Sequence, residues 1–295
     1  MSHKKTVGNL ALARYEDIFK SSMGTPDGER VVEMQRSKLR PPEFHPFQVR
    51  DDLAMQRLVR SVKKYGVLEP GIVRPRVDGN FELLVGNRRD RACELAGRGT
   101  LPVIIRELDD DNAVILMVDS NLEQREKLLF SEKAWAYRVK LEALNHSGVK
   151  SDMLSVEVLI EQTGESKNQI FRFVRLTELI ITLLDRVDAR QLAFNPAVEL
   201  SYLSHVEQTA VAEMMDKYEI KPSLSQAVRL KKMKQSAELS SDVIERVLAE
   251  DKKLSKGDTI ADSRYRRFFP SNYSQKQIDT IIVKLLADWK AGAVV

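Results

Sequence analysis

A strand-like run that leads through a glycine directly into an arginine-rich helix is the feature that most limits what this chain can fold into. The run is Phe81 to Val85, and the segment from Gly86 to Gly97 follows it without a linker. Within that segment, alanine and leucine residues keep helical spacing, and Gly97 provides a C-terminal stop. The sequence therefore predicts a strand, a tight turn and a helix in immediate succession.

Three arginines, Arg88, Arg89 and Arg91, fall in the first turn of this predicted helix. The positive end of the helix dipole disfavours each cation there by about 0.3–1 kcal/mol. An anion at the same place would be stabilised by the dipole, by free N–H groups and by the arginines together. We therefore favour a phosphate site here, with surface pairing to nearby carboxylates as the alternative.

Composition narrows the class of protein. Of the 295 residues, 43% are hydrophobic and 31% are charged, which suits two or three small domains rather than one. No apolar run approaches the roughly 20 residues of a membrane span, and the N-terminus lacks the apolar stretch of a signal peptide. We therefore expect a cytoplasmic protein without membrane contact. The net charge of +4 permits nucleic-acid binding without demonstrating it.

Cysteine and histidine usage supports neither a disulfide framework nor a metal site. Cys93 is the only cysteine, and it lies in the middle of the predicted helix among apolar neighbours, which is typical of a packed thiol. The four histidines are isolated in the sequence and lack metal-ligand spacing.

A small mixed α/β domain is predicted for residues 31–127. Residues 1–30 precede it as a flexible tail, which either solubilises the chain or folds onto a partner. The predicted elements are a strand at Val31 to Met34, a helix capped by Asp51 and Asp52 that ends at Gly66, a hairpin around Asp78 and Gly79, and a strand at Leu101 to Ile105. A helix through Val114 to Val118 follows. We expect the polar run from Asp119 to Arg125 to form a turn and helix cap, because Asp is favoured at both.

Helical signals dominate from about residue 128 onward. We expect an all-helical domain at residues 128–235, a charged helix and linker at 236–270, and a C-terminal amphipathic helix at 271–295. The fold class is thus α+β and mainly α. The last helix carries an apolar stripe from Ile278 to Trp289 that it cannot bury alone, so it must pack on the body of the protein, on a twin from another chain, or on a partner.

The segment from Val156 to Leu176 has the pattern of a helix-turn-helix. Gly164 lies in the expected turn, and Ser166 with Gln169 forms a capping box that opens the second helix. The polar side of that helix carries donors able to reach base edges and phosphates in a major groove, whereas the alternative is an ordinary helical hairpin with a solvated face. The candidate DNA-binding residues are Ser166, Lys167, Asn168, Gln169, Arg172 and Arg175.

A basic cluster, Lys231, Lys232 and Lys234, lies further along the chain. Such a cluster can contact DNA phosphates, and a solvated helix face is the alternative.

Three boxes in the sequence, taken in order, resemble those of the ParB family of DNA-partition proteins: His45 to Arg50, Gly86 to Ala92, and Ser120 to Arg125. The resemblance covers most of residues 31–235, and this variant resembles those of plasmids or integrated mobile elements. It implies a ParB/Srx-type N-terminal domain that binds CTP with Mg²⁺, a helix-turn-helix that reads a palindromic site in double-stranded DNA, and a homodimer. In such proteins the nucleotide closes a clamp around DNA, and a ParA-type ATPase moves the complex. The N-terminal tail is our candidate contact for that ATPase.

The resemblance also implies roles for single residues. Gly86, Arg88 and Arg89 would hold the triphosphate, and Asn121 would lie near the metal. The full set of implied nucleotide-binding residues is Arg50, Gly86, Arg88, Arg89, Asn121 and Arg125.

Two positions depart from the family pattern. Asn87 and Ser120 stand where the family usually has glutamate. Carboxylates are the natural metal ligands and water-orienting groups for triphosphate hydrolysis. We therefore assign no catalytic residue and expect either no enzyme activity or only a weak CTPase.

The leading hypothesis from the sequence is a dimeric, nucleotide-gated and nucleoid-associated DNA-partition protein. The second is a ParB-like transcriptional regulator without a partition role. The third, from a different class, is a nucleotide hydrolase or nuclease on the same N-terminal fold, which the missing carboxylates disfavour.

Overall fold

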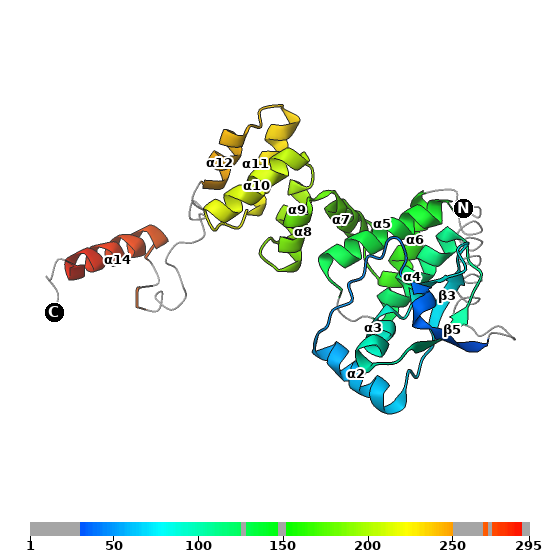
Figure 1. Ribbon diagram of the computed structural model, residues 1–295. Helices are drawn as coiled ribbons and strands as arrows, with labels where there is room; N and C mark the ends of the chain where they lie inside the picture. Colours follow the sequence, from blue (N-terminus) through cyan, green and yellow to red (C-terminus); the bar gives the residue numbers. More distant parts are fainter. Residues whose placement is uncertain (1–29, 125–127, 147–151, 250–267, 271–272, 291–295) are drawn as a thin grey trace, which may run out of the picture.

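The computed structural model describes residues 30–124, 128–146, 152–249, 268–270 and 273–290. The described chain begins with a five-stranded sheet and continues as a long succession of helices (Figure 1). This arrangement confirms the expected fold class, α+β and mainly α.

The sheet is mixed. Its strands are β1 (Val31–Gln35), β2 (Leu39–Arg40), β3 (Gly71–Pro75), β4 (Phe81–Val85) and β5 (Thr100–Ile105), in the spatial order β1-β5-β3-β4-β2. The pairs β1 with β5 and β3 with β4 are antiparallel, and the pairs β3 with β5 and β2 with β4 are parallel. The predicted hairpin between β3 and β4 is present, because Gly79 turns with φ +77° and its N–H donates to the carbonyl of Arg76 (3.1 Å).

Helices cover both faces of this sheet. The helices α2 (Leu53–Tyr65) and α3 (Asn87–Ala96) lie side by side and share a core with one face, and α4 (Asp110–Gln124) packs on the other. Two neighbouring residues of β4 show the division, since Leu83 packs with α2 and α3 whereas Leu84 packs with α4. Alternate side chains of a strand point to opposite faces, so each face of the sheet is buried under its own helices.

The ends of α2 and α3 lie where the sequence predicts them. The carboxylate of Asp52 accepts the N–H of Met55 (2.8 Å) at the start of α2, and Gly66 ends that helix with φ +79°. Gly97 ends α3 in the left-handed region, with φ +75°. Cys93 is buried in the core under α3, which confirms the packed thiol.

The expected turn after Val118 is wrong, because α4 continues to Gln124. Asp119 does not cap a helix but lies buried in its middle, 1% exposed. Its carboxylate pairs with the ammonium of Lys140 and accepts the side-chain N–H of Gln162 (2.9 Å). Burial and ion pairing with later helices thus override the turn preference of this polar run. Arg125, at its end, lies outside the described residues.

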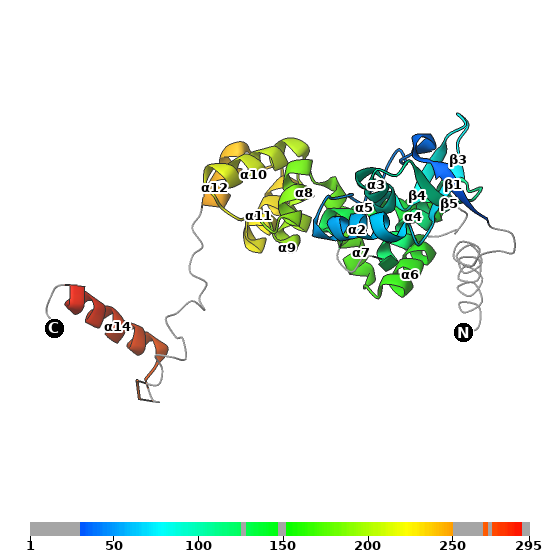
Figure 2. The same ribbon diagram turned by 60° about the horizontal axis from the view of Figure 1, so that its bottom comes forward.

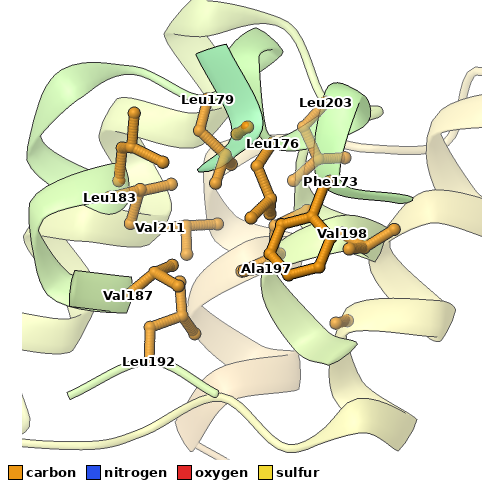
Figure 3. Packing of buried hydrophobic residues seen from close by; sticks show 14 of the residues in the cluster. Phe173, Leu176, Leu179, Leu183, Val187, Leu192, Ala197, Val198, Leu203 and Val211 are labelled. Atoms are coloured by element: carbon orange, nitrogen blue, oxygen red, sulfur yellow. The ribbon is translucent and has the colours of Figure 1, made fainter. Parts of the chain in front are cut away.

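The remaining helices form one continuous core, shown in Figure 3. Phe173, Leu183 and Val211 come from three different helices and meet in it. These helices are α5 (Phe130–His146), α6 (Asp152–Thr163), α7 (Lys167–Arg175), α8 (Ile181–Asp188), α9 (Phe194–Leu200), α10 (His205–Lys217), α11 (Leu224–Gln235) and α12 (Ser241–Ala249).

The last described helix, α14 (Gln275–Lys290), lies apart from the others in both views (Figure 1, Figure 2). In the predicted stripe, Ile278 is buried, Ile281 and Ile282 are half-buried, and Leu285 and Trp289 are more than half exposed in the single chain. Val283 and Leu286, which lie outside the stripe, are also more than half exposed.

Candidate functional site

A loop anchored by one aromatic residue crosses from β2 to α2 and holds the first of the three sequence boxes in place. Phe47 is 2% exposed and packs against Met117 and Val118 of α4 and Ala136 of α5. Burying one phenylalanine side chain stabilises such a loop by about 1.5–3 kcal/mol. The polar residues around Phe47 are therefore held at a defined place beside α4 and α5.

Beneath this loop lies a cavity of about 400 Å³, and the first turns of three helices contribute to its lining. It brings together five of the six nucleotide-binding residues expected from the sequence, the sixth being Arg125. The lining residues are His45, Gln48, Arg50, Asp52, Ala54, Val85, Gly86, Asn87, Arg88, Arg89, Ser120, Asn121, Gln124, Leu129 and Glu132.

The start of α3 is shaped for a close approach to the cavity. Gly86 is the N-cap of α3 with φ +113°, a conformation that L side chains rarely adopt. A Cβ atom there would lie 3.1 Å from the Cα of Gly71 on the neighbouring strand. Since Gly86 has no side chain to cap the helix, the first N–H groups of α3 are left for another acceptor.

The three arginines after Gly86 have different surroundings. Arg89 is 14% exposed and donates to the carbonyls of Glu69 (2.7 Å) and Pro70 (2.6 Å), and its burial lowers its pKa. Arg88 pairs with Asp52 (3.3 Å). Both arginines line the cavity.

Arg91 does not line the cavity. It pairs with Asp51 (2.6 Å) and Glu94 (2.7 Å), and these hydrogen-bonded carboxylates raise its pKa. Surface pairing, the alternative considered from the sequence, therefore describes Arg91.

One of the two positions that depart from the family pattern contacts the first box directly. Nδ1 of His45 lies 2.7 Å from the carbonyl of Phe47, which can only accept, so we place the ring proton on Nδ1. Nε2 then accepts from the amide of Asn87 (3.1 Å), which also donates to the carbonyl of Leu83 (3.3 Å). A glutamate at position 87 would offer His45 an acceptor instead, and would require a protonated ring to keep this contact.

Glu132 joins the loop to the start of α5. It is 4% exposed, and its two oxygens accept the backbone N–H groups of Gln48 (2.8 Å) and Leu129 (2.9 Å). The sequence reasoning did not select Glu132. As the third residue of α5, Glu132 is at the position of a capping-box glutamate, which is a local sequence signal. Its contact with Gln48, 84 positions away, has no such signal.

The expected metal residue, Asn121, lines the cavity on α4. Its amide nitrogen donates to the carbonyl of Met117 (2.8 Å), so its oxygen is the atom with the chemistry of a cation ligand. Ser120 is buried, and its hydroxyl donates to the same carbonyl (3.1 Å). Among the described residues, no group of three or more His, Cys, Asp or Glu side chains could hold a metal by itself.

A second candidate surface lies on α6 and α7, which are joined as the helix-turn-helix pattern predicts. Gly164 occupies the turn with φ +68°, and the hydroxyl of Ser166 accepts the N–H of Gln169 (3.3 Å) at the start of α7. Ile170 and Phe173 are buried beneath α7. The turn is braced from α5, because Lys133 pairs with Glu165 and its ammonium lies 4.8 Å from the ring centre of Phe173.

The candidate DNA-binding residues on α7 divide into two groups. Lys167 and Asn168 are exposed at the start of the helix. Arg172 and Arg175 both contact α9: Arg172 donates to Asn195 (2.5 Å), and Arg175 donates to the hydroxyl of Ser201, the C-cap of α9 (3.0 Å). Arg175 also lies 4.2 Å from the ring centre of Tyr202, and Arg172 lies over Phe194.

The basic cluster on α11 is partly neutralised. Lys231 pairs with Glu199 (2.9 Å), and Lys234 pairs with Glu207 (2.7 Å). Lys232, between them, is exposed.

None of the helices in the described part of the chain has both the length and the apolarity that a membrane span requires.

Comparison with known proteins finds relatives named nucleoid occlusion protein and chromosome-partitioning protein ParB. The family model of the ParB N-terminal domain matches residues 20–122. The nucleoid occlusion protein of Listeria monocytogenes serovar 1/2a is 31% identical over 208 residues, which cover 70% of this chain and 68% of that protein. The probable chromosome 1-partitioning protein ParB of Deinococcus radiodurans is 32% identical over 193 residues, covering 64% and 62%. For the nucleoid occlusion protein of Listeria innocua the match spans 60% of the relative's own length.

Solved structures with a similar fold include the C-terminally truncated chromosome-partitioning protein ParB from Caulobacter crescentus. Its complex with the centromeric parS site has a TM-score of 0.41 at 23% identity, covering 68% of this chain and 98% of that one. Its complex with CTP-γ-S has a TM-score of 0.30 at 26% identity, covering 64% and 98%.

Proposed function

This chain belongs to the ParB family, and from that premise we propose that it is a DNA-binding partition protein whose N-terminal domain is gated by a nucleoside triphosphate. The resemblance to the ParB family that the sequence indicated is confirmed by these matches. The proposed domains are an N-terminal α/β domain at residues 31–127 and a helical DNA-binding domain at 128–235. A charged helix and linker at 236–270 and a C-terminal helix at 271–295 would follow.

The observation that carries this proposal is the cavity of about 400 Å³ that gathers Arg50, Gly86, Arg88 and Arg89. Its volume is in the range of small-ligand sites. Helix N-termini direct their dipoles and unpaired N–H groups at anions, and guanidinium groups add charge-assisted hydrogen bonds. A polyphosphate matches this lining. CTP is the nucleotide that the family resemblance implies, and Asn121 would be the residue near its Mg²⁺, with the side-chain oxygen as the candidate ligand.

The same cavity supports binding better than hydrolysis. Asn87 offers an amide that donates to His45, and the hydroxyl of Ser120 donates within its own helix. Neither supplies the carboxylate that would orient a water or hold a metal during phosphoryl transfer. The nucleotide would therefore act as a ligand that changes the state of the protein, and its turnover would be slow or absent.

DNA would be read by α7. Lys167 and Asn168 are exposed at the start of this helix, the part of a recognition helix that contacts base edges in the major groove. Arg172 would have to exchange its contact with Asn195 for a base or a phosphate.

The protein would act as a homodimer at a palindromic site. Two half-sites related by a two-fold axis require two recognition helices, one from each protomer. The exposed apolar side chains Leu285, Leu286 and Trp289 of α14 would be buried against the second protomer. A ParA-type ATPase would bind the N-terminal tail and move the protein–DNA complex. The tail lies outside the described residues.

A second candidate function follows from the names of the relatives. The Listeria proteins are named nucleoid occlusion proteins rather than partition proteins. A nucleoid-associated, DNA-bound member of the family with a role other than partition, such as transcriptional regulation, is therefore the alternative. A gene for a ParA-type ATPase next to the gene for this chain would favour partition.

Calorimetry tests the nucleotide site. The full chain is titrated with each of the four ribonucleoside triphosphates and Mg²⁺, with and without duplex DNA. We expect heat of binding for CTP and little or none for the other three. An absence of heat with all four would remove the nucleotide-gated clamp, and the cavity arginines would then serve protein carboxylates or DNA.

A further inference from the structure

The cavity contains a negative charge that belongs to the protein itself. Asp52, the N-cap of α2, lines the cavity, and its side chain is 49% exposed. Its Oδ1 accepts the N–H of Met55 (2.8 Å) and also lies 3.3 Å from the guanidinium of Arg88. One carboxylate oxygen therefore serves both the cap of α2 and an arginine at the start of α3.

The contact of Arg88 differs from those of the two other cavity arginines. Arg89 donates to backbone carbonyls, and Arg50 donates to the side-chain oxygen of Gln48 (3.0 and 3.1 Å). Arg88 instead contacts a carboxylate that itself lines the cavity.

Glu132, the other carboxylate of the lining, is not a comparable partner. Its oxygens accept two backbone N–H groups, and it is 4% exposed, whereas Asp52 is accessible. Asp52 is thus the carboxylate of the cavity that a bound anion would meet.

We propose that Asp52 is an internal competitor for the anion: it holds Arg88 while the cavity is free of ligand, and a phosphate group must displace it. The proposal rests on the triphosphate site proposed above. Carboxylates and phosphates accept the same N–H donors of a guanidinium, so a phosphate that takes the Nη2 donor of Arg88 displaces Oδ1 of Asp52 from it. An ion pair this exposed is weak, and a phosphate that also receives helix N–H groups will replace it.

Displacement leaves the carboxylate close to the phosphates. The N–H of Met55 first, and then Arg88, hold the pKa of Asp52 below its ordinary value, so Asp52 carries its charge at neutral pH. Repulsion between like charges then opposes the bound anion. Asp52 thereby sets the concentration of anion that fills the site, and it links phosphate binding to the first turn of α2.

The adjacent residue provides a matched control. Asp51 carries the same charge next to Asp52, but it pairs with Arg91 and does not line the cavity. Asp52→Asn removes the charge and keeps the helix cap, because Asn caps helices as well as Asp. Asp51→Asn changes the net charge of the protein equally.

The test is calorimetric titration of the full chain and both variants with CTP and Mg²⁺, and separately with sodium tripolyphosphate without metal. We expect Asp52→Asn to bind both ligands about three- to tenfold more tightly than the wild type at low ionic strength, with a smaller gain as salt rises. Asp51→Asn should stay within about twofold of the wild type. Circular dichroism confirms that each variant is folded.

Each other outcome overturns the proposal. Equal affinity of Asp52→Asn and wild type would show that the carboxylate does not compete. Weaker binding of Asp52→Asn only in the presence of Mg²⁺ would make Asp52 a ligand of the metal instead. If the wild type binds and Asp52→Asn gains nothing, this inference alone fails. If neither the wild type nor a variant binds either ligand, the triphosphate site is wrong and the inference fails with it.

Discussion

The cavity at the start of α3 and the exposed side of α7 both present arginines, but the two regions hold them in opposite ways. In the cavity, Arg88 faces a carboxylate that a bound anion can replace. On α7, Arg172 and Arg175 donate to neutral oxygens of α9 and its C-terminal end and lie over aromatic rings. The cavity is lined by the first turns of three helices, whereas α7 presents Lys167 and Asn168 to solvent while its arginines contact α9.

This difference suggests how the two regions would recognise phosphate. In the cavity, dipoles, N–H groups and arginines converge on one small anion, so the loss of a single group should be felt strongly. A DNA duplex instead contacts an extended surface with many weak phosphate contacts, where each cation contributes a small and salt-dependent share.

Lys140→Ala tests the connection between the two regions. Lys140 is fully buried, and it pairs with Asp119 of α4 and contacts Gln162 of α6. Leaving Asp119 buried without its partner should lower the free energy of unfolding by about 3–5 kcal/mol, measured by urea denaturation. The exposed pair of Lys217 with Glu245 is the control, and Lys217→Ala should change stability little. Similar stability of both variants would contradict a structural role for the buried pair.

Arg88→Ala tests the cavity. Removing one arginine that contacts phosphate should weaken nucleotide binding by about 1.5–3 kcal/mol, which is tenfold or more. Arg91→Ala is the control, because Arg91 lies outside the cavity and pairs with Asp51 and Glu94. Calorimetry measures both. If the two variants lose affinity equally, the effect comes from net charge. The cavity would then not depend on single arginines more strongly than α7 does.

Arg172→Ala tests the reading of bases by α7. If Arg172 contacts a base, the variant should lose about 1–3 kcal/mol of discrimination between the selected duplex and random duplex, measured by competition binding. Asn195→Ala is the control: it removes the partner of Arg172 in the free protein but leaves Arg172 itself in place. Unchanged discrimination in Arg172→Ala would remove this residue from the set that reads sequence.

Lys232→Ala tests the weakest contribution. Lys232 is exposed on α11, so it should weaken binding to all duplexes alike and reduce the slope of log affinity against log salt by about 1. Lys234→Ala, whose lysine pairs with Glu207, should change the slope less. Identical slopes for the wild type and Lys232→Ala would place α11 away from the DNA.

The sequence alone determined the elements whose signals are local. Three features depend on atoms within a few residues: the cap of α2 by Asp52, the end of α3 at Gly97 and the hairpin at Gly79. Their residue types therefore predict them. The arginine-rich start of α3 was equally visible, because helix geometry puts those residues in one turn.

The tertiary structure alone decided what lies between distant segments. The polar run at Asp119 has the composition of a turn, yet burial against Lys140 keeps it helical. The contacts of Glu132 with Gln48 and of His45 with Asn87 had no local sign, since these partners lie 84 and 42 positions apart.

The physical reason is the range over which each interaction acts. Caps and turns close hydrogen bonds within about four residues, so the sequence carries their information directly. The cavity forms where the first turns of α2, α3 and α5 meet, and the loop beside it is anchored by the burial of Phe47 against α4 and α5. The hydrophobic effect is not directional and does not depend on separation along the chain. Only the folded structure therefore shows that Asp52 and Arg88 share one site.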